Sequence, residues 1–195
     1  MLADGLHDVP AGKIAMVVTY LETRTPQMRG APCPEGLTFE PLPRRADVYK
    51  DVYRRVGQDW MWGDRLRMDD AVLLEILLNR DIGLWSLTQG GTPEALLELD
   101  FRQPDRCILA YFGVTAPLIG TGAGAFLMDR AQEMAFAARD LLTVQTCTLD
   151  SPQALGFYQR SGFTGTHRAV EVVDDPRLTG VLPWDVMPDL PMIDA

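Results

Sequence analysis

The sequence of 195 residues is 47% hydrophobic and carries a formal net charge of −9. This length and composition suffice for one well-packed domain, and no apolar run approaches the roughly 20 residues that span a bilayer. The negative charge disfavours nucleic acid as a partner, because phosphate binding requires a basic patch. It favours a cationic or amine-bearing partner, although acidity that only keeps the protein in solution is an equally good explanation.

The cysteine and histidine content restricts the chemistry further. Cys33, Cys107 and Cys147 are odd in number and widely spaced, which indicates reduced thiols rather than a disulfide framework or a zinc site. With His7 and His167 as the only histidines, we expect no metal centre. The N-terminus lacks the basic and apolar pattern of an export signal, so we expect a cytoplasmic protein without a membrane partner.

In the first part of the chain, apolar spacing and turn residues predict four elements. Val48, Val52 and Val56 form one helical stripe, and Gly57 suits the end of that helix. The predicted elements are strands over 14–21 and 37–41, a helix over 46–56, and a helix that Asp69 or Asp70 caps and that runs to residue 78.

Two tryptophans, Trp60 and Trp62, lie between these helices. They form either the wall of an acceptor pocket or a part of the core, because large aromatic side chains dominate burial in both settings. The sequence leaves both explanations open.

The rest of the chain alternates strands with helices. Gly90 and Gly91 predict a hairpin turn, and Ser151 as N-cap with Pro152 as the first helical residue predicts a short helix. The order strand, glycine turn, helix, strand is a βαβ unit with a right-handed crossover. The predicted elements are hairpin strands over 82–88 and 95–101, strands over 107–114, 141–149 and 163–173, and helices over 123–138 and 152–158.

These elements predict a single domain over residues 13–182. Residues 1–12 and the proline-punctuated stretch 183–195 are expected to be flexible or peripheral termini.

A glycine-rich turn directly precedes the helix predicted over 123–138. Gly120, Gly122 and Gly124 let the backbone approach a ligand closely, and the helix N-terminus adds unpaired N–H groups and the positive end of the helix dipole. An anion is the expected occupant, which suggests a nucleotide-bearing cofactor.

A dinucleotide is one alternative for this turn. Residues 120–125 satisfy the pattern G-x-G-x-x-G/A, and Asp150 ends the next strand, where a ribose-binding acid stands in that fold. However, only about 45 residues follow Asp150, which is too few for the remaining strands and the catalytic half of a dinucleotide enzyme.

Over residues 37–163 the sequence instead resembles the GNAT acyltransferase superfamily. The stretch from Ile119 to Gly124 resembles that family's Q/R-x-x-G-x-G/A pyrophosphate loop, and the stretch from Asp150 to Phe163 resembles its N-x-x-A-x-x-F-Y-x-x-x-G-F segment. Ile119 replaces the usual glutamine or arginine, which leaves phosphate binding to backbone amides and the helix dipole. Asp150 stands where asparagine is common and is expected to act as a helix cap at the end of the strand, without a catalytic role.

The resemblance implies an α/β (α+β) GNAT fold, in which a mixed, mostly antiparallel sheet is splayed at its middle and flanked by helices on both faces. It implies acetyl-CoA as cosubstrate and direct transfer of its acetyl group to the amine of a small molecule or a peptide. A backbone amide near Phe112 to Val114 would polarise the thioester carbonyl. The implied cofactor-binding residues are Phe112, Gly113, Val114, Ile119, Gly120, Thr121, Gly122, Ala123 and Gly124.

Tyr158 resembles the family tyrosine that gives a proton to the departing thiolate. A phenol is protonated at pH 7, as this role requires. We expect Phe157 to fill the core while Tyr158 points elsewhere; a core position for Tyr158 is the alternative.

A protonated amine must lose a proton before it attacks, either to a carboxylate through water or to solvent. Glu98 is the candidate base, because it shares a strand face with Leu96 and Asp100 beside the expected active centre. Asp100 is the second candidate, and the alternative is that both acids face solvent. A covalent route through Cys147 is disfavoured, because no histidine is placed to activate it.

Two further questions stay open at the level of sequence. A catalytically silent acyl-CoA-binding or regulatory module of the same fold is the second functional hypothesis. A homodimer is compatible with the sequence, which specifies neither the oligomeric state nor the amine acceptor.

Overall fold

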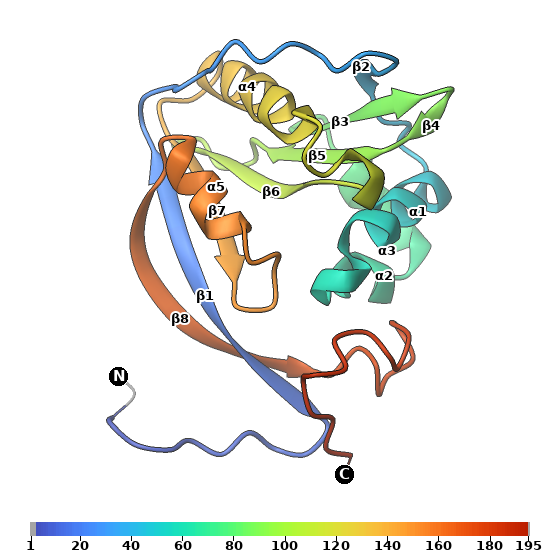
Figure 1. Ribbon diagram of the computed structural model, residues 1–195, viewed down its shortest axis with the longest axis vertical. Helices are drawn as coiled ribbons and strands as arrows, with labels where there is room; N and C mark the ends of the chain where they lie inside the picture. The colour runs from blue at the N-terminus through green and yellow to red at the C-terminus, as the bar shows by residue number, and fades with distance from the viewer. Residues whose placement is uncertain (1–2, 195) are drawn as a thin grey trace.

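A mixed β-sheet forms the centre of the molecule, and helices pack against both of its faces (Figure 1). This computed structural model describes residues 3–194; residues 1, 2 and 195, at the tips of the two termini considered above, lie outside the described residues. The strands are β1 (Lys13–Thr23), β2 (Thr38–Pro41), β3 (Ile82–Gln89), β4 (Thr92–Pro93), β5 (Ala95–Asp100), β6 (Cys107–Val114), β7 (Leu142–Cys147) and β8 (Thr164–Asp174). The helices are α1 (Ala46–Gly57), α2 (Asp64–Arg67), α3 (Asp70–Leu77), α4 (Ala123–Phe136) and α5 (Ala154–Arg160), with the 3-10 helices η1 (Gln58–Trp60) and η2 (Ala116–Leu118).

The strand order in the sheet is β2-β3-β5-β6-β7-β1-β8, and β4 pairs with β3. The pair β6 and β7 is parallel, whereas the other strand pairs of the described chain are antiparallel. The mixed, mostly antiparallel sheet that the sequence predicted is therefore confirmed, and so is the hairpin that joins β3 to β5. In the described residues, no helix combines the length and the apolar character that a bilayer crossing requires.

Alternation along β5 supplies side chains to two apolar layers. All 6 residues of this strand are buried. Leu97 and Leu99 belong to the cluster beneath α4, and Leu96 belongs to the cluster beneath α1 and α3. Each such leucine stabilises the fold by about 1.5–3 kcal/mol through the apolar surface that it buries. Helices α4 and α5 thus pack on one face of the sheet, and helices α1 to α3 pack on the other.

The parallel strands β6 and β7 separate after a short stretch of pairing. Residues 107–109 pair with 142–144, and no described residue of β7 pairs with the rest of β6. Ala110 forms a bulge, because Glu98 of β5 faces Tyr111 whereas Leu99 faces Leu109. The bulge bends β6 at the point where the two strands part. We call the opening between residues 110–114 and the end of β7 the wedge.

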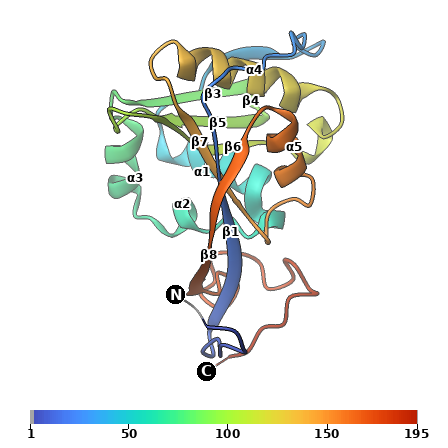
Figure 2. The ribbon, with the colours of Figure 1, turned by 90° about the vertical axis from the view of Figure 1, so that its left-hand side faces the viewer.

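The N-terminal strand β1 lies between β7 and β8, antiparallel to both. No sequence pattern predicted this position, because strand pairing over such a distance leaves no local signal. β1 and β8, with 11 residues each, continue together past the rest of the sheet as a two-stranded ribbon (Figure 2).

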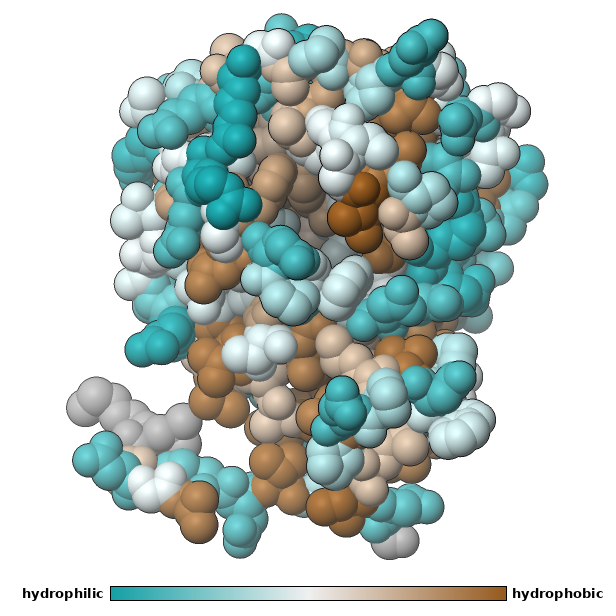
Figure 3. Space-filling model, viewed as in Figure 1, coloured by the Kyte–Doolittle hydropathy of each residue, from teal (hydrophilic) through white to brown (hydrophobic). Residues whose placement is uncertain are grey.

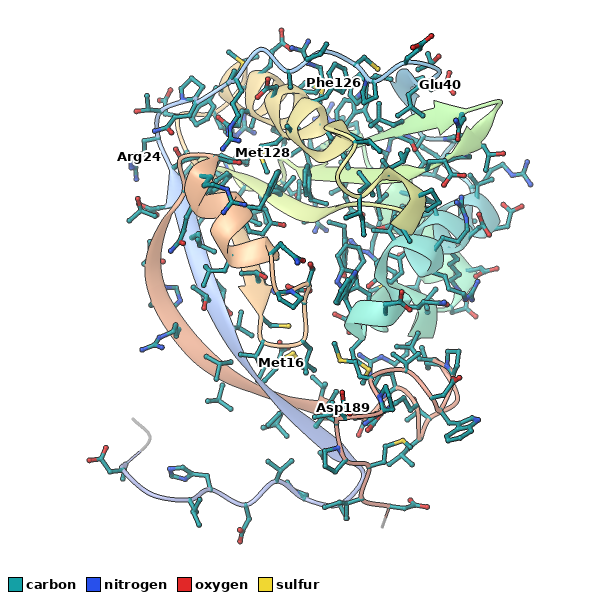
Figure 4. The ribbon with its side chains drawn as sticks, in the orientation of Figure 1. Met16, Arg24, Glu40, Phe126, Met128 and Asp189 are labelled. Carbon is teal, nitrogen blue, oxygen red and sulfur yellow. The ribbon has the colours of Figure 1, made fainter. Side chains whose placement is uncertain are left out.

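The segment after β8 packs against the lower end of this ribbon. Ile14 of β1 and Val186 are buried in one small apolar cluster, toward which Met16 also points from β1 (Figure 4). The buried guanidinium of Arg177 donates to three backbone carbonyls of the segment. Part of the stretch 183–195, which was expected to be peripheral, is therefore held in the fold.

Two helix starts show where capping signals succeed and fail. Asp69 caps α3 as predicted, because its side chain accepts the backbone N–H two residues later at 2.8 Å. The other prediction is wrong: α5 begins at Ala154 and not at Pro152, and its N-cap is Gln153. The hydroxyl of Ser151 donates instead to the Gln153 side chain at 2.6 Å, so Ser151 belongs to the turn that joins β7 to the helix.

Candidate active site

Between β6 and α4 the chain makes a turn that we call the glycine turn, residues 119–122. Gly120 and Gly122 have φ angles of +81° and +90°, which residues with side chains rarely adopt. A Cβ atom added at either position would meet no atom within 4 Å, so the backbone of the turn borders open space. Ile119 stands beside it with 62% of its surface exposed. Figure 3 shows that this face of the molecule is hollowed between α5 and the segment that precedes α4.

Several backbone donors of this region are unpartnered. The N–H groups of Gly120, Gly122, Gly124 and Ala125 donate to no described residue. They lie at the N-terminus of a helix of 14 residues, whose dipole places positive potential at the same point. Free amides and a helix N-terminus together suit a phosphate group.

On the neighbouring strand, Phe112 and Val114 present backbone groups to the wedge. The N–H of Thr115 donates at 2.9 Å to the carbonyl just before β5, so Thr115 faces β5. The alternation of an antiparallel pair then directs the N–H and C=O groups of Val114 and Phe112 away from β5. Gly113 is required for space, because a Cβ atom there would lie 2.5 Å from Val56 of α1.

Tyr158 of α5 is buried near these backbone groups. Its side chain is 7% exposed, and its ring centroid lies 6.3 Å from that of Phe112 and 5.8 Å from that of Phe163. The alternative that Tyr158 takes a core position is therefore confirmed, because Tyr158 belongs to the buried cluster on this face of the sheet, whereas Phe157 is only partly buried against it. Phe157 lies instead near α4, where a Cβ atom added at Gly124 would be 3.9 Å from its ring.

The hydroxyl group of Tyr158 makes no hydrogen bond within the described part of the chain. Burial, and after it the negative charge of Asp150, raises the pKa of Tyr158 above its ordinary value of 10.0. The phenol is therefore protonated at neutral pH.

Trp62 spans the wedge from the segment between η1 and α2. Its ring packs 5.3 Å from Tyr53 and 5.4 Å from Tyr111, and its Nε1–H donates to Asp150 Oδ1 at 3.1 Å. Gly57 makes room for the indole, because a Cβ atom there would lie 2.3 Å from the ring. Trp62 therefore packs against the core, as one of the two explanations requires, and its polar edge reaches Asp150 at the end of β7. The acceptor pocket stays a prediction.

Glu98, the predicted base, is fully buried beneath α1 and α2. Its carboxylate accepts hydrogen bonds from the Tyr49 hydroxyl and from Arg65 Nη2, the latter at 2.5 Å. The alternative that Glu98 faces solvent is thus wrong, and Arg65 already compensates its charge. The role of Glu98 as a base stays a prediction.

Asp100, the second candidate base, lies at the far end of β5 from the glycine turn. It is 7% exposed, faces Ile108 across the pair with β6, and forms an ion pair with Arg102 at 2.6 Å. Its carboxylate therefore serves a local contact at a distance from the wedge.

Cys147 lies at the end of β7, on the other side of the wedge. Burial, and after it the charge of Asp150, raises the pKa of Cys147 to about 11, so the thiol is protonated at neutral pH. His167 stacks on Tyr20 in the ribbon, and no described histidine contacts the thiol. This geometry gives no support to a covalent route.

The structure thus gathers part of the predicted site and separates the rest. The glycine turn, the segment Phe112 to Val114 and Tyr158 surround the wedge, whereas Glu98 lies beyond β6. Sequence reasoning missed the bond between Trp62 and Asp150. Two signals for it were present: an acid where the motif has asparagine, and a tryptophan in a connecting segment.

Comparison with known proteins supports the same reading of the fold. The sequence profile described as "Acetyltransferase (GNAT) family" matches residues 49–163, and no curated protein is significantly similar to the chain. A solved GCN5-related N-acetyltransferase from Sphaerobacter thermophilus is 16% identical with a TM-score of 0.61, over 93% of this chain and 54% of that one. Ard1 from Thermoplasma volcanium is 17% identical with a TM-score of 0.56, over 71% of this chain and 98% of that one. A tandem GNAT protein from the clavulanic acid biosynthesis pathway is 14% identical with a TM-score of 0.58, over 87% of this chain and 55% of that one.

Identities this low show a shared fold, and this chain spans only 54% and 55% of the lengths of the first and third of these proteins. The family profile carries the stronger statement. It covers more than half of the chain and includes both the glycine turn and the segment that ends at Phe163. The chain therefore belongs to the acetyltransferase (GNAT) family.

Proposed function

We propose that this protein transfers the acetyl group of acetyl-CoA directly to the amine of a small molecule or peptide. The observation that carries the proposal is the set of unpartnered amides at Gly120, Gly122 and Gly124 beside the wedge. These residues fit the cosubstrate, because a pyrophosphate needs N–H donors that no side chain obstructs. A Cβ atom added at Gly120 or Gly122 would meet no atom within 4 Å, so it would project into the space where the pyrophosphate is proposed to bind.

Each residue group at the wedge has a task in this reaction. Acetyl-CoA supplies an activated acetyl thioester. The glycine turn binds the pyrophosphate, with the dipole of α4 in place of the basic side chain that Ile119 lacks. A free N–H of Phe112 or Val114 stabilises the negative charge that develops on the carbonyl oxygen. Tyr158 then protonates the departing thiolate.

A second candidate is an acyl-CoA-binding module without catalytic activity. Two observations favour it. Trp62 reaches across to Asp150 at the wedge, and Arg65 already compensates the charge of Glu98. This candidate predicts that the protein binds CoA and releases no free thiol from acetyl-CoA with any amine.

The test is release of free CoA thiol from acetyl-CoA over a panel of primary amines, with wild-type protein and Tyr158→Phe. We expect turnover to fall about 100-fold or more in the variant, because a positioned acid contributes 10²–10⁴-fold, while CoA affinity changes little. Tyr20→Phe is the matched control, since Tyr20 stacks on His167 in the ribbon. Unchanged turnover in Tyr158→Phe would exclude Tyr158 as the acid.

A further inference from the structure

Asp150 is held in one orientation at the end of β7. Its Oδ2 atom accepts hydrogen bonds from Thr146 Oγ1 at 2.7 Å and from the Cys147 N–H at 2.9 Å. Its Oδ1 atom accepts the Trp62 indole N–H at 3.1 Å. A carboxylate has about four acceptor positions, so three neutral donors leave room for one more.

The charge of this carboxylate has no counter-ion. In the part of the chain that the structure describes, no lysine, arginine or histidine lies within ion-pair distance of Asp150, which is half-buried. The more deeply buried Glu98, Asp100 and Asp175 are each paired with an arginine. Asp129 is also buried. Its carboxylate accepts the backbone N–H groups of Arg29 and Ala31, so it holds the segment before β2 in place. A half-buried carboxylate that has no cationic partner and keeps one acceptor position free attracts a cation.

Asp150 lies at the edge of the wedge, just after β7. The indole that binds it lies against β6, since a Cβ atom on Gly113 would be 3.7 Å from the Trp62 ring. The carboxylate therefore borders the wedge opposite the free backbone groups of Phe112 and Val114. Its charge also acts on Tyr158, so the carboxylate and the phenol share one environment. The Trp62 ring, which packs edge-on against Tyr111, adds an aromatic wall beside the carboxylate, and the face of such a ring attracts an ammonium group.

We propose that Asp150 binds the ammonium group of the acceptor in the wedge, and that the Trp62 indole N–H holds this carboxylate in place. The inference rests on the proposed function, because it assigns the amine site of the same reaction. It depends on a departure from the motif that the sequence resembles, in which asparagine is common at this position.

The proton balance follows from this arrangement. The acceptor nitrogen loses two protons when its N–C bond forms and the C–S bond of the thioester breaks. Asp150 takes the proton that the ammonium group gives up and passes it to solvent. The second proton replaces the one that Tyr158 gives to the sulfur atom. The sum is one amide, one CoA thiol and one released proton.

The test compares Asp150→Asn, Trp62→Phe and the control Asp59→Asn, which removes one negative charge from an exposed position three residues before Trp62. Calorimetry in the presence of saturating CoA measures binding of tyramine, spermidine and L-lysinamide, and of the alcohol that replaces the amine of tyramine by a hydroxyl group. We expect Asp150→Asn to weaken binding of the amines at least about tenfold and to leave the alcohol unchanged, because a hydrogen bond to a charged group is lost. Trp62→Phe removes only the N–H that positions the carboxylate, so it is expected to weaken amine binding about three- to fivefold, less than Asp150→Asn does. Asp59→Asn is expected to stay within about threefold of wild type, as is CoA affinity in all variants.

The outcomes separate this inference from the proposed function. Equal losses in Asp150→Asn and Trp62→Phe would overturn it, because Asp150 would then act only by holding the indole. Amine binding that is unaffected by Asp150→Asn, or absent from wild-type protein for every probe, would overturn it as well. If the amines bind through Asp150 but no thiol is released from acetyl-CoA, the amine site stands and the proposed transferase activity falls.

Discussion

Arg65 and Glu98 form an ion pair that is almost fully removed from solvent. The side chains are 9% and 0% exposed, and the Nε atom of Arg65 is buried without a hydrogen-bond partner. The Tyr49 hydroxyl supplies the second hydrogen bond to the carboxylate, and burial followed by the charge of Glu98 raises the pKa of Tyr49. Each of these groups depends on the others, because a buried charge without its partner is costly.

Glu98→Gln is expected to lower the free energy of unfolding by about 3–5 kcal/mol, because it leaves Arg65 buried without a counter-charge. Arg65→Met is expected to cost a similar amount, and the double variant Arg65→Met/Glu98→Met is expected to recover most of the loss. Urea denaturation measures all three. If Glu98→Gln instead keeps wild-type stability and loses turnover, then Glu98 acts as the catalytic base that the sequence predicted.

At the scale of elements, the glycine turn and α4 act as a unit for anion binding. Gly122→Val places a β-branched side chain at a φ angle of +90° and fills the open space above the turn. We expect CoA affinity to fall at least about tenfold, since the pyrophosphate loses its access to the amides. Calorimetry with CoA measures this.

The matched control for the turn is Gly12→Val. Gly12 also has a positive φ angle, +75°, and open space around it, but it lies just before β1 in the ribbon. Backbone strain is thus similar in both variants, and only Gly122→Val is expected to affect CoA binding. Equal affinity in the two variants would contradict the assignment of the turn.

The segment after β8 depends on a second buried ion pair. Arg177 Nη2 lies 2.7 Å from Asp175 Oδ2, and both side chains are 1% exposed. Asp175→Asn is expected to destabilise the protein by about 3–5 kcal/mol, because Arg177 then stays buried without its partner. Asp174→Asn, which breaks only the exposed pair with Lys13, is expected to change stability little. Thermal denaturation at pH 7 compares the two, and equal effects would contradict the account.

The same pair predicts a response to acid. Burial acts against the shift, but the hydrogen bonds and charge of Arg177 hold the pKa of Asp175 below its ordinary value of 3.8. A lowered carboxyl pKa stabilises the folded state above the unfolded-state value, and this contribution is lost as the pH falls through the folded-state pKa. The stability difference between wild type and Asp175→Asn should therefore be constant from pH 7 to about pH 5 and shrink below about pH 4. A difference that grows as the pH falls would contradict this assignment.

For the molecule as a whole, features that depend on neighbouring residues could be predicted from the sequence, whereas pairings between distant strands could not. The hairpin about Gly90 and Gly91 and the cap at Asp69 depend on neighbouring residues, so the sequence predicted both. The insertion of β1 between β7 and β8 depends on partners more than 100 residues away, as in the pair Val18 and Cys147, and no local pattern encodes it. The burial of Glu98 was missed for the same reason, because Arg65 and Tyr49 come from other elements.

The motif around Tyr158 was located from its sequence, yet its orientation was not. In a helix as short as α5, the position of the first residue affects which of the side chains at 157 and 158 faces the sheet. The sequence predicted that the helix begins at Pro152, whereas it begins two residues later at Ala154. The homodimer also stays a prediction. The edge strand β8, with Val170 and Val172 about half exposed, is where a second copy would have unpaired backbone groups available.

The central claim is that the glycine turn and the wedge between β6 and β7 hold acetyl-CoA. A crystal structure of the protein with CoA tests it most directly. We expect the pyrophosphate oxygens within hydrogen-bond distance of the amides of Gly120, Gly122 and Gly124, and the CoA sulfur beside Tyr158 and the free edge of Phe112 to Val114. A pyrophosphate bound elsewhere, with the glycine turn facing only water, would contradict the account.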